Sequence, residues 1–410
     1  MSTQAAPAVP GTALPEGVPA TLLGELTEVI ARHAAPRADE GPTRWGHGDD
    51  RVSVVAERSE GEAEEIAALR AYRGDLAAAG LSWLDGPARW GGRELPAAAA
   101  GWARDVEAGY ELPDDGYLRF SLSILCRTLL EHGTDELQER YLRGLRSAEL
   151  IACQLYSEPG AGSDLAGLST TAVRDGDGWR LDGQKVWSSG AHFADLGLCI
   201  ARTDPAAPKH AGLTTFLVDM RAPGVEVRPI RQLTGGASFD EVFLTGVHVP
   251  DDHRIGPVDG GWPVVVTSLL HERSAIGREV GVDDTLVQRL VDLARHVGDP
   301  GDSRVRDRVA DVAIRAWAAR LTTDRMLADG VPGPEMALGK LLTTDLLRDV
   351  SDVAADLLGA AHVADTGEWG TYAWSELTLG LPGLRVGGGT DEILKNAVGE
   401  RVLNLPKDAR

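Results

Sequence analysis

Hydrophobic residues in the first third of the chain recur at spacings of three and four, the period of an amphipathic helix. This pattern runs through residues 21–36, 60–80 and 134–150. A glycine ends the second run, and Thr134 stands at the start of the third, where its hydroxyl can cap the first turn. The sequence therefore predicts an N-terminal helical domain over residues 20–150.

The pattern changes near Ile151, where short runs rich in Val, Thr, Ile and Phe replace the helical period. These runs lie between residues 178 and 256, separated by Asp-Gly and Ala-Pro-Gly turns, and are typical of β-hairpins. Helical spacing returns from about Gly260. We therefore expect an α+β, multidomain fold, with a central β domain over residues 151–258 and a C-terminal helical bundle over residues 259–410.

Residues 1–19 are rich in alanine and proline and have no basic region followed by an apolar one. This composition favours a disordered tail over a secretory signal. The sequence contains no run of eighteen apolar residues, so we expect no membrane span. Three widely spaced cysteines suggest neither a disulfide framework nor a zinc site, and the expected location is the reducing cytoplasm.

The net charge of −21 narrows the set of partners. Nucleic acids recruit basic surfaces, so we do not expect nucleic-acid binding. A small anionic ligand needs only a local cluster of Lys or Arg and stays compatible with this charge. His192, His210 and His271 show no metal-ligand spacing, and Ser163 lacks the His and Asp partners of a hydrolase.

Two short motifs in the β region carry candidate chemistry. EPGAGSD, residues 158–164, is a glycine-rich turn that lets a bound group approach the backbone closely. KVWSSG, residues 185–190, places an indole beside two hydroxyls. Either motif alone is poor evidence, because a glycine-rich turn is usually only a turn and a strand tryptophan usually belongs to a core.

In this order and spacing the motifs resemble the acyl-CoA dehydrogenase family, in particular its FadE-type actinobacterial branch. The phrases SEPGAGSDLAGL, GQKVWSSGAHFAD, VDMRAPGVEVRPIRQLTGG and GGTDEI carry the resemblance, which extends over nearly the whole chain. It implies an N-terminal helical domain, a central β-barrel or β-sandwich domain and a C-terminal four-helix bundle. It also implies FAD, usually in a homotetramer, and oxidation of the Cα–Cβ bond of an acyl thioester.

The resemblance assigns cofactor roles residue by residue. The strand ending at Ser157 is placed along the flavin ring, the glycine-rich turn near the flavin phosphate and the substrate, and the tryptophan motif against the ring. For Tyr156 simple packing stays open as an alternative. Gly359 is what persists of a motif that touches the FAD of an adjacent subunit in relatives, since Asp356 replaces its glutamine. The resulting cofactor residues are Leu155, Tyr156, Ser157, Gly162, Ser163, Trp187, Ser189, Gly359, Thr390 and Glu392.

GGGTDEI, residues 387–393, resembles the family loop that commonly carries the catalytic base. The glutamate of that loop aligns with Gly388, which has no side chain. The resemblance still gives the Gly388 N–H a hydrogen bond to the thioester carbonyl, and it places Thr390 and Glu392 near the flavin. Loss of the side chain also predicts a wider pocket, which suits a branched or bulky acyl group.

Removal of an α-proton needs a carboxylate held against the substrate Cα. Some family members carry it on the first long helix of the C-terminal domain, in a pair that matches Glu272 and Arg273. Glu272 is therefore the expected base, and Arg273 is expected to organise the helix beside the substrate. The alternative is a Glu272 that lies on the surface or pairs with Arg273 or Arg278.

Three functions stay open from the sequence. The first is FAD-dependent dehydrogenation of an acyl-CoA or a carrier-protein-bound acyl group, with electrons passed to an electron-transfer flavoprotein or a similar acceptor. The second is an oxidase or monooxygenase on the same fold. The third is a non-catalytic partner subunit of a hetero-oligomer. The expected assembly is a homo-oligomer, either a dimer or a tetramer.

Overall fold

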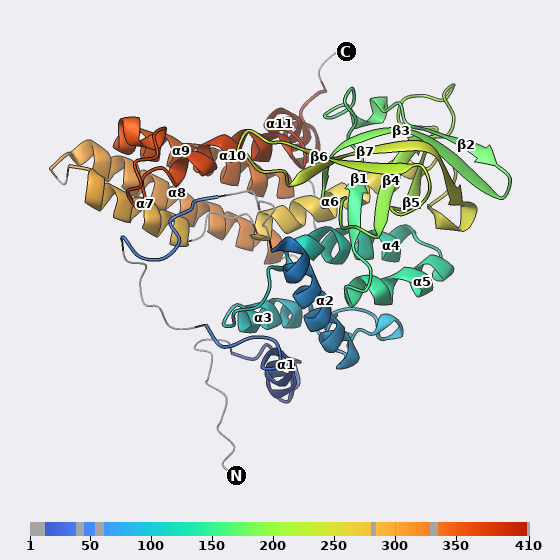
Figure 1. Cartoon of the computed structure of the whole chain (residues 1–410), viewed down its shortest axis with the longest axis horizontal. Coiled ribbons are helices and arrows are strands. Elements are labelled where there is room, and N and C mark those ends of the chain that lie inside the picture. The colour runs from blue at the N-terminus through green and yellow to red at the C-terminus, as the bar shows by residue number, and fades with distance from the viewer. Residues whose placement is uncertain are drawn as a thin grey trace, which may run out of the picture.

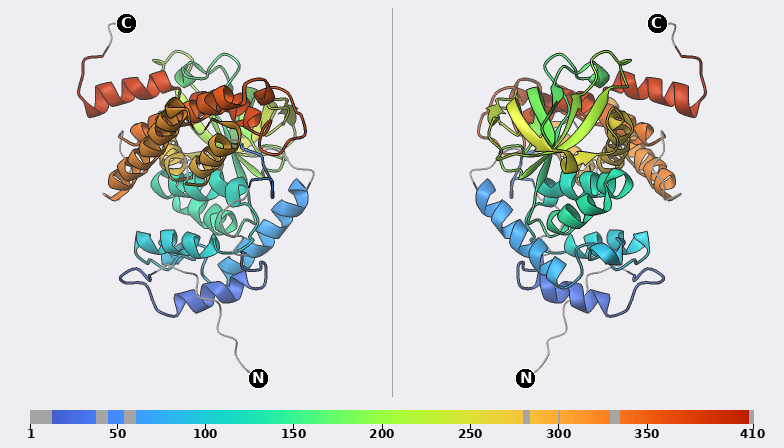
Figure 2. Two further views of the ribbon diagram at one scale, coloured as in Figure 1. Left: turned by 90° about the vertical axis from the view of Figure 1, so that its left-hand side faces the viewer. Right: turned by 90° about the vertical axis from the view of Figure 1, so that its right-hand side faces the viewer.

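The computed structural model describes residues 13–37, 45–53, 61–279, 284–299, 301–328 and 335–407. Figure 1 shows a sheet region beside a long set of C-terminal helices, with the N-terminal helices below both. The side views in Figure 2 agree, because the N-terminal helices lie beneath the sheet and the bundle in each of them. Among the described helices, none is long and apolar enough to cross a membrane.

The N-terminal helices are α1 (Leu22–Ile30), α2 (Glu62–Ala78), α3 (Ala97–Glu107), α4 (Cys126–His132) and α5 (Asp135–Arg146). Three of them, α1, α2 and α5, lie within the runs where the hydrophobic spacing predicts them, and α3 and α4 lie between the second and third runs. Thr134 caps α5, since its side-chain oxygen accepts a hydrogen bond from the Leu137 N–H at 3.3 Å. Val18 is buried in the core of this group, so packing begins inside the segment expected to be a tail, whose residues 1–12 lie outside the described part.

The central region is an eight-stranded mixed sheet. Its order is β6-β7-β3-β2-β4-β5-β8, and β1 pairs in parallel with β4. One buried cluster lies among its strands, and a second lies between the sheet and helices α4, α5 and α6. The strands are β1 (Ala152–Leu155), β2 (Thr171–Asp175), β3 (Gly178–Ser189), β4 (Leu196–Arg202), β5 (Leu213–Asp219), β6 (Val225–Ile230), β7 (Phe239–Pro250) and β8 (Arg254–Ile255).

The C-terminal helices pack around a core that includes Leu290, Val350 and Leu377, each of them 0% exposed. The first of these helices, α6, lies between the bundle and the sheet in Figure 1 and contacts β5 on one side and α9 on another. The helices are α6 (Gly261–Glu279), α7 (Asp284–Val297), α8 (Ser303–Ala328), α9 (Met336–Leu358), α10 (Trp374–Val386) and α11 (Asp391–Ala397).

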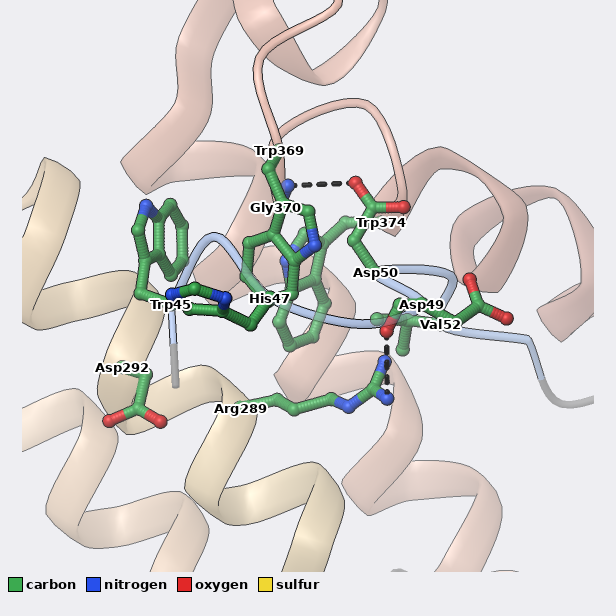
Figure 3. A pocket seen from close by; sticks show the side chains of 10 residues that line it. All are labelled: Trp45, His47, Asp49, Asp50, Val52, Arg289, Asp292, Trp369, Gly370 and Trp374. Atoms are coloured by element: carbon green, nitrogen blue, oxygen red, sulfur yellow. Dashed lines mark hydrogen bonds between the residues drawn. The ribbon is translucent and has the colours of Figure 1, made fainter. Parts of the chain in front are cut away.

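Residues 45–53, which we call the N-terminal strap, lie against the C-terminal helices and not with the helices that flank them in sequence. Val52 is buried in the core of the bundle. Arg289 donates to the Arg51 carbonyl at 2.6 Å, and the Trp45 ring stacks on His296 with centroids 4.5 Å apart. The strap and the bundle enclose a small pocket lined by indole rings and carboxylates (Figure 3). The helical spacing of the sequence gave no indication of this contact.

Candidate functional site

The glycine-rich turn is anchored by a buried ion pair. Lys185 on β3 and Glu158 at the start of the turn are 0% and 5% exposed, and Lys185 Nζ lies 2.9 Å from Glu158 Oε1. Glu158 also accepts from the N–H groups of Ser169 and Thr170, at 2.7 and 2.9 Å. Lys185 donates in addition to the Tyr156 carbonyl at 3.1 Å. The pair therefore fixes the chain on both sides of the turn.

The electrostatics of this pair give Glu158 a structural role. Burial alone would raise the pKa of the Glu158 carboxyl, but the Lys185 ammonium and the hydrogen bonds outweigh it and lower the pKa to about 2. The carboxylate is therefore ionised at neutral pH and cannot act as a proton-transfer group there. Its charge serves to hold Lys185 and the turn.

Trp187 projects from the sheet on a β-bulge. The register of β3 against β7 shifts between Lys185 and Ser188, and Trp187, inside that shift, has a φ of +61°. A bulge re-aims a side chain, and here it leaves the indole 59% exposed. The ring makes an edge-on contact with Phe239, with centroids 6.0 Å apart. Its face is thus available to stack on a planar aromatic ring.

The surroundings of Trp187 fit the expected FAD. Ser189, Gly162 and Ser163 are exposed, and a Cβ added to Gly162 would meet nothing within 4 Å. The turn therefore leaves space beside its backbone for a bound group. The Ser188 hydroxyl is buried with no hydrogen-bond partner in the described part of the chain. An indole, several hydroxyls and an open glycine turn together suit a flat, polar-edged ring and a phosphate.

The segment after β1 joins this turn to the strand of Trp187. β1 ends at Leu155, two residues before the strand end expected from the sequence. The Leu155 side chain is fully buried, so only its backbone can meet a cofactor. Ser157 is half-buried, and its carbonyl accepts from the Val186 N–H at 2.8 Å. This bond brings the turn beside β3.

Tyr156 ties β1 to α6. The phenol is buried and its oxygen lies 2.7 Å from Ser268 Oγ on that helix. Burial raises the pKa of Tyr156, and the nearby Glu272 carboxylate adds to the rise. The hydroxyl is therefore neutral at physiological pH and is engaged in this contact between the sheet and the helix.

Glu272 faces the same strand from α6. Its Oε2 accepts a hydrogen bond from Gln154 Nε2 on β1 at 3.2 Å, and the side chain is half-buried. The Glu272 side chain is thus partly covered by β1. The side chains of Arg273 and Arg278 lie outside the described part of the structure.

The loop after α10 is held by a buried lysine. Gly388 and Gly389 have φ values of +66° and +100°, which residues with a Cβ rarely adopt. Lys340 on α9 is 1% exposed, and its Nζ donates to the carbonyls of Gly387 and Gly389. Among the described residues, no backbone carbonyl accepts from the Gly388 N–H. The family resemblance predicts that this amide binds the substrate carbonyl.

The residues that follow fasten the loop to α11. Thr390 caps that helix, because its hydroxyl oxygen accepts from the Ile393 N–H at 3.2 Å. Asp391 is 2% exposed and accepts from Thr344 Oγ1 at 3.2 Å and from Arg385 Nε at 2.7 Å. A Thr hydroxyl that accepts in a cap can still donate its own proton elsewhere.

The structure brings the predicted residues together in two groups, one around β1 and β3 and one in the loop after α10. Trp187 and Ser189 lie beside the glycine-rich turn, and Glu272 lies between β1 and α6. The Gly388 loop lies on α9, which packs against α6. Gly359 ends α9 with a φ of +53°, at the opposite end of the helix from Lys340. At 1.5 Å per residue this is roughly 28 Å away.

Sequence reasoning missed the lysines that hold the two loops. Lys185 belongs to the KVW motif, and Lys340 stands alone in the apolar stretch MALGKLL. A single lysine on an otherwise apolar helix face is a signal of a buried, hydrogen-bonded ammonium, and it could have identified Lys340.

His192, for which the sequence showed only that it has no metal-ligand spacing, contacts two carboxylates. Its Nδ1 lies 2.7 Å from Asp240 Oδ2 on β7, and its Nε2 lies 2.7 Å from Glu62 Oε2 on α2. Burial lowers the pKa of His192, but the hydrogen bonds to both carboxylates outweigh burial and leave the pKa raised. The imidazole thus joins the N-terminal helices to the sheet, close to the tryptophan motif.

The profiles of one protein family match more than half of the chain. Residues 153–247 match the profile of the acyl-CoA dehydrogenase middle domain, and residues 259–403 match that of the acyl-CoA dehydrogenase C-terminal domain. The two matches lie on either side of residues 248–258, and they include both loops and Glu272.

Individual relatives agree with the family profiles. Acyl-CoA dehydrogenase IpdE1 of Mycobacterium tuberculosis is 36% identical over 358 residues, covering 85% of this chain and 91% of that protein. Acyl-CoA dehydrogenase FadE34 of the same organism is 39% identical over 68% of this chain, which spans only 39% of FadE34. Among solved structures, the Tcur3481-Tcur3483 steroid ACAD superposes with a TM-score of 0.72 at 28% identity, over 97% of this chain and 100% of that one.

Proposed function

The chain belongs to the acyl-CoA dehydrogenase family of FAD-dependent oxidoreductases, and on that premise we propose that Glu272 removes the α-proton of its acyl thioester. When bound, FAD would supply the redox chemistry, as the acceptor of the hydride from Cβ. The product is the trans-2-enoyl thioester. The protein supplies the base, the hydrogen-bond donors and the shape of the site.

The contact between Glu272 and Gln154 carries this proposal. The Gln154 amide donates to one oxygen of the carboxylate and so limits the orientations of the side chain. Tyr156 closes the adjacent part of the interface between β1 and α6, and its buried ring limits the access of water. A half-buried carboxylate with a fixed orientation is what α-proton removal requires.

We assign the Gly388 amide to the thioester carbonyl. Charge develops on that oxygen as the α-proton leaves, and a backbone N–H placed beforehand stabilises it. The loop can supply this donor although it carries no base, because a glycine keeps its N–H. Both glycines at positive φ are compatible with this role, since a side chain at Gly388 would be strained.

For the cofactor we propose two sets of residues. Trp187 and Ser189 would lie against the flavin ring, with backbone groups of Leu155 to Ser157 along its edge, and Gly162 and Ser163 would lie near its phosphate. Thr390 and Glu392 would approach the FAD of the same or a neighbouring subunit. Gly359 would meet the FAD of a neighbouring subunit, because it lies far from the Gly388 loop in its own chain.

We propose a bulky acyl group, of steroid type, carried by CoA. The missing side chain at Gly388 leaves room near Cα, and one structural neighbour is described as a steroid ACAD. That neighbour joins two different chains by name, which supports assembly of this chain with a further subunit of its own kind or another. The electron acceptor would be an electron-transfer flavoprotein or a similar carrier.

The test is an anaerobic titration of the purified protein with butyryl-CoA, isobutyryl-CoA and cholyl-CoA, followed by flavin absorbance. Wild type is compared with Glu272→Gln and with Glu131→Gln. The control changes a carboxylate that contacts the neighbouring His271 at 2.7 Å. We expect one thioester to bleach the wild-type flavin, and the Glu272 variant to be slower by about 10²–10⁴-fold, the range of general-base catalysis. The control should stay within about twofold of wild type.

Three other results would contradict the assignment of the base or the proposed function. Equal bleaching of wild type and Glu272→Gln would exclude Glu272 as the base. A yellow protein that no CoA ester bleaches would favour a carrier-protein substrate or oxygen chemistry. A protein purified without flavin would favour a non-catalytic partner subunit.

A further inference from the structure

We propose that Lys340 is a positioning residue for the reaction: it sets the direction of the Gly388 N–H by holding the carbonyl groups on both sides of it. This inference rests on the proposed role of that amide. Lys340 itself touches neither the substrate nor the cofactor in this proposal. It acts through the backbone of the loop.

The geometry of the peptide unit explains how the lysine can act. The carbonyl of Gly387 and the N–H of Gly388 belong to one planar, trans peptide unit, so they point in opposite directions. An ammonium that fixes the Gly387 oxygen therefore also fixes the direction of the Gly388 N–H, which points away from α9. The second bond, to the Gly389 carbonyl, fixes the peptide unit between Gly389 and Thr390.

Three consecutive glycines make such a hold necessary. Ordering a backbone residue costs conformational entropy, and glycine loses more freedom than any other residue. A loop of three glycines would otherwise sample many directions for the Gly388 N–H. Two charge-assisted bonds from a side chain that is 1% exposed offset this cost.

A second residue of α9 supports the same loop. Thr344 lies one turn after Lys340, on the same face of the helix, and donates to Asp391 at 3.2 Å. Arg385, from the end of α10, holds the other oxygen of Asp391 at 2.7 Å. The loop is therefore fastened by α9 at both of its ends, which limits its freedom around Gly388.

The charge of Lys340 has an electrostatic effect as well as a geometric one. A cation on the carbonyl oxygen polarises the peptide and makes its N–H a stronger donor, as happens in chains of hydrogen bonds. The substrate oxygen gains negative charge as the α-proton leaves. The ammonium would thus favour the charged transition state over the ground state, which is the difference that raises kcat.

The first arm of the test needs no substrate. Amide hydrogen exchange of residues 386–391 is measured by mass spectrometry in the purified protein for wild type, Lys340→Met, Lys340→Arg and Val350→Ala. Val350 is a buried residue of α9 in the bundle core, so its variant controls for general loss of stability. We expect exchange in this loop to be at least about tenfold faster in Lys340→Met than in the control. Unchanged exchange would overturn the proposal.

The second arm separates positioning from simple structural support. Kinetics use the thioester that bleaches the wild-type flavin among butyryl-, isobutyryl- and cholyl-CoA. Displacing an oxyanion donor should lower kcat of Lys340→Met by about 10- to 100-fold, with KM within about twofold. Lys340→Arg should recover part of kcat, because a guanidinium can donate to both carbonyls. Wild type should also bind the thioester more tightly than its S-alkyl thioether, and Lys340→Met should lose that preference.

The outcomes of the two arms are distinguishable. Faster exchange with an unchanged kcat and an unchanged thioester preference would show that Lys340 holds the loop without positioning the amide, and would overturn the inference. If no thioester bleaches the wild type, the proposed function fails, while the exchange arm still decides whether Lys340 holds the loop.

Discussion

Two buried lysines hold the two glycine-rich loops of this enzyme, and they use different partners. Lys185 donates to the Glu158 carboxylate and to the carbonyls of Tyr156 and Ile200. Lys340 donates to the carbonyls of Gly387 and Gly389. A carboxylate can be protonated or removed, which leaves a charge buried without its counter-ion, whereas a backbone carbonyl does not titrate. The lysine of the first loop therefore acts through a carboxylate, whereas the second loop is held through its backbone by Lys340 and through Asp391 by Thr344 and Arg385.

The largest loss of stability is expected when the ion pair between Lys185 and Glu158 is broken. Lys185→Met should lower the free energy of unfolding by about 3–5 kcal/mol, because Glu158 stays buried without its cation. Urea denaturation of the FAD-bound protein measures this. The double variant Lys185→Met with Glu158→Gln should recover part of the loss, since it removes both charges. A loss below about 1 kcal/mol in the single variant would mean that the pair is not the anchor of the turn.

Acid should lower the hydrogen-exchange protection of the first loop more than that of the second. The pKa of Glu158 is lowered from 4.5 to about 2, so its contribution to stability is fully present above about pH 4.5 and is lost as the pH falls toward 2. The shift corresponds to about 3 kcal/mol. Hydrogen-exchange protection at pH 5.5 and pH 3.5, corrected for intrinsic rates, should fall for residues 158–170 more than for residues 386–391. Equal losses in both segments would contradict the comparison.

The smallest effect is expected at Thr344, which supports the second loop without a charge. Thr344→Val keeps the shape of the side chain and removes one hydrogen bond to Asp391, which Arg385 still holds. We expect a loss of about 1 kcal/mol in unfolding free energy and a modest rise in loop exchange. Both effects should be smaller than those of Lys340→Met. If Thr344→Val loosened the loop more, the second loop would depend on Asp391 and not on the ammonium.

The regular elements could be predicted because their signals are local. Thr134 ahead of a helical run predicted its cap, and the change of hydrophobic period near Ile151 predicted the change from helices to strands. The family resemblance supplied FAD and the acyl thioester. These predictions depend on residues a few positions apart.

The lysines that hold the two loops could not be predicted from such local signals. Lys185 is 27 residues from Glu158, and Lys340 is 47 residues from Gly387. Hydrophobic periodicity indicates which face of an element is buried, but it does not indicate which backbone group a buried lysine meets across the fold. The bulge that exposes Trp187 depends likewise on the register between β3 and β7. Such features follow from tertiary packing.

The N-terminal strap affects the order in which the chain can fold during synthesis. Arg51 and its partner Arg289 are 238 residues apart, so at 5–20 residues per second the ribosome needs roughly 10 to 50 s to make the second after the first. Val52 must wait through that interval before the helix that buries it exists. Completion of the bundle is thus a late event, and until then the nascent chain exposes the Val52 and Trp45 side chains that the bundle later covers.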